Sequence, residues 1–125
     1  MAEFLSDAWI TDLDAAARQA AAPSGLRLVV QQVVLGERGA DTRYVIRFDD
    51  GRVSVTAGQA EDADLTLTQD RATAAEIARG ELSAQVAFMA GRLRVGGDLR
   101  DVVERSRDLA AMADVFEATR ATTTW

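Results

Sequence analysis

Few residues in this chain are suited to catalysis. Its 125 residues include no cysteine, no histidine and no lysine, so all 14 basic residues are arginine. These absences exclude a Ser-His-Asp triad, a cysteine nucleophile, a Schiff base with pyridoxal phosphate and a thiolate zinc site. The groups that remain are carboxylates, hydroxyls, the single phenol of Tyr44 and arginine as an electrophile. The composition therefore leaves few classes of enzymatic reaction open.

The strongest enzymatic combination among these groups is a carboxylic acid beside a phenol. A carboxyl group whose pKa is raised in an apolar cavity can catalyse an isomerisation or a cyclisation. Asp64 and Tyr44 are the first candidates for such a pair. The apolar runs of the chain contain no cluster of acids, however, so we expect no catalytic residue. A small cavity enzyme is kept as an alternative.

One short acidic sequence resembles part of a metal-binding loop. Asp49 and Asp50 precede Gly51, but the further acidic positions of a calcium loop are absent. Asp50-Gly51 is explained fully as a two-residue hairpin turn, because both central residues of such a turn take positive φ. We therefore expect no metal ion and no cofactor.

Length and charge restrict the partners of this chain. Its length fits a single domain over residues 1–125, with 48% hydrophobic and 27% charged residues. The net charge of −6 disfavours nucleic acid and anionic membrane surfaces, whose binding depends on cationic side chains. No apolar run reaches 18 residues, and the first residues lack the pattern of a signal peptide. We expect no nucleic-acid partner, no stable membrane insertion and a cytoplasmic location.

The hydrophobic pattern predicts an α+β fold. Strands grouped early and helices grouped late indicate one curved sheet with helices over one face, and the first three strands form an antiparallel meander. The last five residues look like a frayed end. The predicted helices cover 4–22, a segment from Asp70 or Thr73 to Gly80, 83–90 and 98 to about 120; the predicted strands cover 26–35, 43–49, 52–57, 63–68 and 92–95.

The stretch from Ser83 to Asp98 is the most informative part of the chain. Ser83 is suited to cap a short helix, and Gly91 to end it. Within that helix only Gln85 is polar, and a helix that is apolar all round is buried or lies against another apolar surface. We therefore predict a buried helix, followed by a strand and, after Gly96-Gly97, a long final helix.

Several short motifs occur in an order that resembles the sterol carrier protein type 2 family. They are ADLTL at 63–67, GEL at 80–82, QVAFM at 85–89 and GRLRVGGD at 91–98. The resemblance is strongest over residues 62–100. It implies a five-stranded, mostly antiparallel sheet covered by helices on one face, with an apolar cavity between the two layers.

The resemblance also implies a function: binding of a fatty acid, an acyl chain or a sterol-like lipid, as a carrier or delivery protein. Such a protein needs no catalytic group, because the transfer of each methylene group from water into an apolar cavity is favourable by about 0.8 kcal/mol of free energy. An ordinary filled core is the competing interpretation of the same apolar stripes. The candidate lining residues are Tyr44, Ile46, Phe48, Leu82, Phe88, Met89, Leu93, Val95, Met112, Val115 and Phe116.

A third class of function is a non-catalytic partner subunit. The chain ends on a tryptophan, Trp125, which is a natural contact for another protein. A homodimer and a complex with a partner enzyme are the two assemblies of this kind that we consider.

Overall fold

One five-stranded sheet forms the centre of the molecule. The structure is a computed structural model, and it describes residues 2–19, 25, 27–36, 39–97, 116–117 and 119–125. The strand order is β4-β3-β2-β5-β6. β2 pairs with β3 and β3 with β4 in antiparallel fashion, β5 runs parallel to β2, and β6 is antiparallel to β5. The bounds are β2 (Arg27–Leu35), β3 (Thr42–Asp49), β4 (Arg52–Ala57), β5 (Leu65–Asp70) and β6 (Leu93–Gly96).

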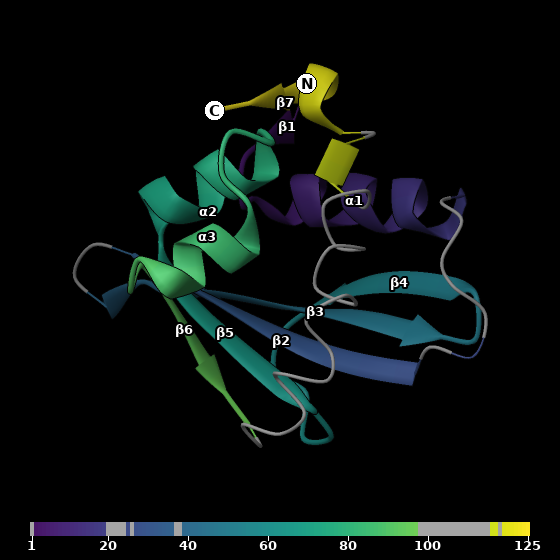
Figure 1. Ribbon diagram of the computed structural model, residues 1–125. Helices are drawn as coiled ribbons and strands as arrows, with labels where there is room; N and C mark the ends of the chain where they lie inside the picture. Colours follow the sequence, from purple (N-terminus) through teal and green to yellow (C-terminus); the bar gives the residue numbers. More distant parts are fainter. Residues whose placement is uncertain (1, 20–24, 26, 37–38, 98–115, 118) are drawn as a thin grey trace.

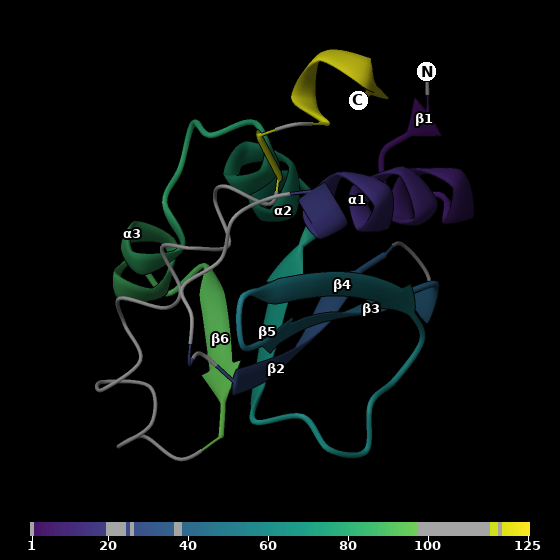
Figure 2. The same ribbon diagram turned by 90° about the vertical axis from the view of Figure 1, so that its right-hand side faces the viewer.

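In the described part of the chain, three helices cover one face of this sheet (Figure 1). They are α1 (Asp7–Gln19), α2 (Arg71–Ala78) and α3 (Ala84–Met89). α1 lies over β4, and α3 lies beside β6 at the other edge of the sheet (Figure 2). The predicted α+β class and the mostly antiparallel five-stranded sheet are confirmed. None of the helices in the described part of the chain is long and apolar enough to cross a membrane.

The core lies between the sheet and the helices because side chains alternate along each strand. On β3, Tyr44, Ile46 and Phe48 face the helices and are each at most 3% exposed. On α1, Trp9 and Leu13 meet them from the other side, at 1% and 0% exposed. The predicted inward row of β3 is therefore buried.

α1 begins later than the predicted position 4. Residues Ala2–Glu3 form a short strand, β1, and Leu5 takes a positive φ of 68°, which no helical residue adopts. The Ser6 hydroxyl then accepts a hydrogen bond from the Trp9 N–H at 3.1 Å, as an N-cap does. Further along α1, the Asp14 carboxylate accepts from the Val55 N–H at 2.8 Å and so occupies a free donor of the edge strand β4.

The β3–β4 hairpin has the predicted turn. Asp50 and Gly51 both have positive φ, 49° and 89°. These values fit the two-residue turn that matches the twist of antiparallel strands. The Asp50 carboxylate also accepts a hydrogen bond from the Gly25 N–H at 2.7 Å, so it has a structural role in this turn.

β5 ends two residues later than predicted, and this moves the start of α2. Gln69 and Asp70 continue the ladder with β2, opposite Val34 and Leu35. Asp70 is the N-cap of α2 and accepts from the Thr73 N–H at 2.7 Å. Of the two predicted starts, Asp70 is therefore correct, and Thr73 lies inside the helix. α2 ends as predicted before Gly80, whose φ is +79°.

α3 has the predicted caps but not the predicted burial. The Ser83 hydroxyl accepts from the Val86 N–H at 3.1 Å, and Gly91 after the helix has a φ of +76°. Only Ala87 is buried, however, while Phe88 and Met89 are 43% and 84% exposed. The prediction of a buried helix is wrong, because a six-residue helix at the edge of the sheet has only one side against the core.

The C-terminal residues are ordered rather than frayed. Arg120–Thr122 form a 3-10 turn, and Thr123–Thr124 form β7, which pairs in parallel with β1 beside the N-terminus (Figure 1). The Trp125 ring lies 4.9 Å from the Phe4 ring. The predicted final helix from 98 to about 120 falls mostly on 98–115, which lie outside the described residues.

Candidate ligand-binding site

A small cavity lies between the sheet and helices α2 and α3. Its volume is about 10 Å³, which is room for about one water molecule. The apolar wall contains side chains from β5, α2, α3 and β6, together with Phe116 near the C-terminus. The described residues that line the cavity are Gln32, Tyr44, Leu67, Gln69, Ala74, Ile77, Ala84, Leu93 and Phe116.

Two glutamines form a polar floor in this apolar wall. Gln32 on β2 and Gln69 on β5 are only 2% and 6% exposed. The Gln69 Nε2 donates a hydrogen bond to the Gln32 Oε1 at 2.8 Å. The Gln69 Oε1 is buried and accepts no hydrogen bond from the described residues. A buried polar atom without a partner is costly, so this oxygen marks an unusual point in the cavity.

Tyr44 borders the cavity beside a group of aromatic rings. Its burial raises the pKa of the phenol well above the ordinary value, since the charged phenolate is poorly solvated there. The Trp9 ring lies 5.7 Å from the Tyr44 ring in an edge-to-face arrangement and 6.3 Å from the Phe116 ring in a stacked one. Tyr44 is therefore a neutral phenol fixed by aromatic packing.

The structure brings three of the predicted lining residues to this cavity: Tyr44, Leu93 and Phe116. Ile46 and Phe48 lie in the same inward row of β3 but are buried in the surrounding core. Met112 and Val115 lie outside the described residues. Leu82 and Val95 are half-buried against the core, and whether they contact a ligand stays a prediction.

The two predicted residues of α3 lie elsewhere. Phe88 and Met89 are exposed, together with Val86 at 54%. They form an apolar outer surface on α3, while Ala84 and Ala87 face inward. A role for Phe88 and Met89 in ligand binding would therefore have to be at an entrance rather than in the wall of a closed cavity, and it too stays a prediction.

Sequence reasoning missed six of the lining residues, including both glutamines. Gln32 stands next to Gln31 in a strand that is otherwise apolar from Leu28 to Leu35, and Gln69 continues the inward row of Leu65 and Leu67. A polar residue in an inward row was the signal that would have identified each glutamine. The four other missed residues are apolar, and no pattern distinguishes them from ordinary core.

The alternative catalytic pair does not come together. Asp64 accepts a hydrogen bond from the Val29 N–H at 2.8 Å and lines a surface hollow with Arg27 and Arg47, whereas Tyr44 borders the interior cavity. Asp64, the residue that precedes β5, is thus connected to β2 by a hydrogen bond and has a structural role. No group of three or more carboxylates suited to a metal ion occurs among the described residues.

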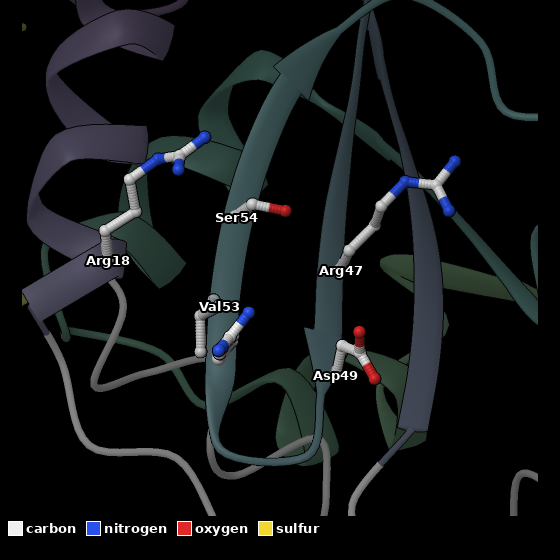
Figure 3. Close-up of a pocket in the computed structure, with 6 residues that line it drawn as sticks. Arg18, Arg47, Asp49, Val53 and Ser54 are labelled. Atoms are coloured by element: carbon white, nitrogen blue, oxygen red, sulfur yellow. The ribbon is translucent and has the colours of Figure 1, made fainter.

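A larger hollow lies on the surface of β3 and β4, with a volume of about 480 Å³ (Figure 3). Its charged lining residues are Arg18 on α1, Arg47 and Asp49 on β3 and Arg52 on β4, and two of these arginines pair with carboxylates. Arg18 pairs with Asp14 at 3.0 Å, and Arg47 pairs with Asp62 at 2.8 Å. Because two of the three arginines that line it are already paired at an exposed surface, we regard this hollow as a weaker candidate than the interior cavity.

Comparisons with known proteins bear on the family and the fold of this chain. A family model described as the SCP-2 sterol transfer family matches residues 11–107. No curated protein matches the chain.

Solved structures with the same fold are similar over nearly the whole chain. A crystal structure of sterol carrier protein 2 superposes with a TM-score of 0.74 at 20% identity, covering 94% of this chain and 98% of that one. A conserved hypothetical protein from Thermus thermophilus, described as possibly a sterol carrier protein, gives a TM-score of 0.70 at 19% identity and covers 100% and 93%. Palmitated SCP2L2 from Aedes aegypti gives 0.62 at 19% identity and covers 87% and 91%. At these identities the likeness establishes the fold.

Proposed function

This chain belongs to the SCP-2 sterol transfer family, and on that basis we propose that it binds a hydrophobic small molecule between its sheet and its helices. The ligand is a fatty acid, another acyl chain or a sterol-like lipid, and the protein acts as a non-enzymatic carrier that delivers it. The observation that carries the proposal is the family match, which spans more than three quarters of the chain and includes most of the cavity wall.

The apolar wall supports this proposal energetically. Apart from Gln32, Gln69 and Tyr44, every described residue that lines the cavity has an apolar side chain. A chain of sixteen methylene groups gains more than about 10 kcal/mol when it leaves water, before the entropic losses of binding. Such a gain needs shape and apolar surface rather than a reactive group.

Binding requires the interior to open, because the cavity of about 10 Å³ is far smaller than an acyl chain. We propose that α3 is the element that moves. It contributes Ala84 to the cavity wall, buries only Ala87 and leaves Phe88 and Met89 in water. An element with so little buried apolar surface costs less to displace than α1 or the sheet.

The proposal is tested by lipid binding to the purified protein. Native mass spectrometry of protein taken from cells is expected to show a lipid adduct, and a fluorescent fatty acid is expected to bind in titration. Replacing Ile77, a half-buried wall residue of α2, by tryptophan fills the cavity and should weaken that binding at least tenfold.

A matched control distinguishes filling from general damage. Arg94→Trp adds the same ring on β6, at an exposed position opposite Thr68 on β5, outside the cavity wall. It should leave the affinity for the fluorescent fatty acid unchanged. A protein that carries no lipid and takes up no fluorescent fatty acid would refute the carrier function.

A further inference from the structure

We propose that Gln69 makes the protein selective for the polar end of the ligand. The preferred ligand is a neutral lipid with a hydroxyl group, such as a long-chain alcohol. This inference rests on the proposed lipid-binding function. It adds a specificity-determining residue and the chemistry that this residue recognises.

The orientation of the Gln69 amide is set by its neighbour. Its Nε2 is held by the Gln32 Oε1 at 2.8 Å, so the amide carbonyl is the end left without a partner from the described residues. Gln69 is 6% exposed and lines the cavity. Its register neighbours in the sheet are Val34 and Leu93, whose side chains have no hydrogen-bond donor.

An unpaired carbonyl oxygen in an apolar wall favours a hydrogen-bond donor. A hydroxyl group donates one hydrogen, and it carries no charge to be desolvated on entry. A carboxylate has only acceptor oxygens, so it would be placed against the oxygen of Gln69 without any hydrogen bond between them. An ether or ester lipid has the same deficiency. The site therefore distinguishes donors from acceptors rather than long chains from short ones.

An ordered water molecule is the alternative partner for the Gln69 oxygen, since the cavity has room for about one. The two interpretations differ in one consequence. If the oxygen recognises the lipid, the binding affinity depends on whether the lipid can donate a hydrogen bond. If a water molecule remains there, that affinity is independent of the polar end.

The test is a displacement titration with two lipids that differ only in the donor. A fluorescent fatty acid is bound to the protein, and 1-hexadecanol or its methyl ether is added to displace it. We expect the alcohol to bind about tenfold more tightly than the ether, as one hydrogen bond to a buried acceptor predicts. Palmitate, ionised at neutral pH, should bind more weakly than the alcohol.

Two variants assign this preference to Gln69. Gln69→Met removes the amide while keeping a side chain of similar length, and it should reduce the difference between alcohol and ether to less than twofold. Leu65→Met introduces the same side chain four residues earlier in the same inward row of β5, outside the cavity wall, and it should keep the preference. If the Gln69 variant fails to fold, the comparison of the two lipids on the wild-type protein still decides whether the site prefers a ligand that donates a hydrogen bond.

The outcomes separate the inference from the function on which it rests. Equal binding of alcohol and ether to the wild-type protein, or tighter binding of the ether, overturns the role of Gln69 and leaves the carrier function standing. A wild-type protein that binds neither the fluorescent fatty acid nor either lipid overturns both. Retention of the preference in the Gln69 variant assigns it to another residue and also overturns the inference.

Discussion

Two adjacent glutamines show how neighbouring residues of one strand take different roles. Gln31 and Gln32 lie on opposite faces of β2, because strand side chains alternate. Gln32 points into the core and accepts from Gln69. Gln31 lies on the other face, where its Nε2 donates to the carbonyls of Tyr44 and Gly58 at 3.2 and 3.1 Å and its Oε1 accepts from the Ala60 N–H at 2.7 Å. Gln31 therefore fixes the chain after β4.

Replacing Gln31 should destabilise the fold without changing lipid preference. Gln31→Leu removes the partners of several buried or half-buried backbone groups, so we expect the free energy of unfolding to fall by about 2 kcal/mol. Urea denaturation measures the loss. Thr56→Ala, at an exposed position of β4, is the control and should change the free energy by less than about 0.5 kcal/mol. Equal midpoints for the two variants would contradict the structural role of Gln31.

Asp70 should make stability depend on pH in the acid range. The Thr73 N–H donates to this N-cap carboxylate and holds the pKa of the Asp70 carboxyl below its ordinary value of 3.8. A lowered folded-state pKa means that the stabilisation is fully present above the unfolded-state value and disappears as the pH falls through the folded-state value. The stabilisation is therefore lost below about pH 4.

The variant Asp70→Asn isolates this titration, because asparagine caps a helix but carries no charge. The difference in unfolding free energy between wild type and Asp70→Asn should shrink as the pH is lowered from 6 to 2. Denaturant titrations at several pH values measure it. A difference that stays constant over that range would show that the Asp70 charge contributes nothing.

At the scale of elements, α3 shows that composition alone does not determine burial. Its sequence is apolar except for Gln85, yet Val86, Phe88 and Met89 are exposed. Its inner side packs against β6, and the backbone N–H of Arg92 after the helix donates to the Ala87 carbonyl at 2.9 Å. The Arg92 side chain also pairs with Glu76 on α2. α3 is thus held at one side and at its C-terminal end.

The exposure of α3 leads to a comparison of two large-to-small substitutions. Phe88→Ala should lower the free energy of unfolding by less than about 1 kcal/mol, because the ring is 43% exposed. Leu93→Ala on the adjacent strand β6 should cost about 2–5 kcal/mol, because Leu93 is 2% exposed and its truncation leaves a cavity. Thermal and urea unfolding measure both variants. A loss of about 3 kcal/mol or more for Phe88→Ala would place that ring in the core after all.

At the scale of the whole molecule, the two chain ends close on each other. β1 and β7 pair in parallel, with Ala2 opposite Thr123 and Glu3 opposite Thr124. Arg120 extends this closure to α2, where its Nε donates to the Ala78 carbonyl at 2.7 Å. A side chain at Gly80 would come within 2.9 Å of the Arg120 guanidinium, so glycine permits the close approach. The tail is therefore part of the fold.

Trp125 should contribute to stability rather than to partner binding. Its ring contacts Phe4 at 4.9 Å, and the Arg79 guanidinium lies 4.9 Å from the ring centroid. Trp125→Ala should lower the free energy of unfolding by about 1–2 kcal/mol, from the lost aromatic and cation–π contacts. Thermal unfolding measures it, with exposed Thr124→Ala as the control. An unchanged melting temperature for Trp125→Ala would contradict this structural role and would favour the tail as a contact surface for another protein.

The sequence by itself determined the elements whose signals are local. The alternation along β3, the Asp50-Gly51 turn, the Ser83 cap and the glycines after α2 and α3 each depend on neighbouring residues, and all are confirmed. The motifs between Ala63 and Asp98 indicated the family, and the family match over residues 11–107 confirms it. Local rules of backbone geometry and side-chain alternation are readable without knowing what packs where.

Only the tertiary structure decided features that depend on what lies opposite a side chain. The apolar sequence of α3 does not state how many of its sides meet the core, and the tail sequence does not state that β1 is within reach. The cavity is the clearest case, since Gln32 and Gln69 are 37 residues apart and meet only because β2 and β5 pair in parallel. Alternation gives the direction of each side chain, whereas its partner and the space around it follow from the packing of distant elements.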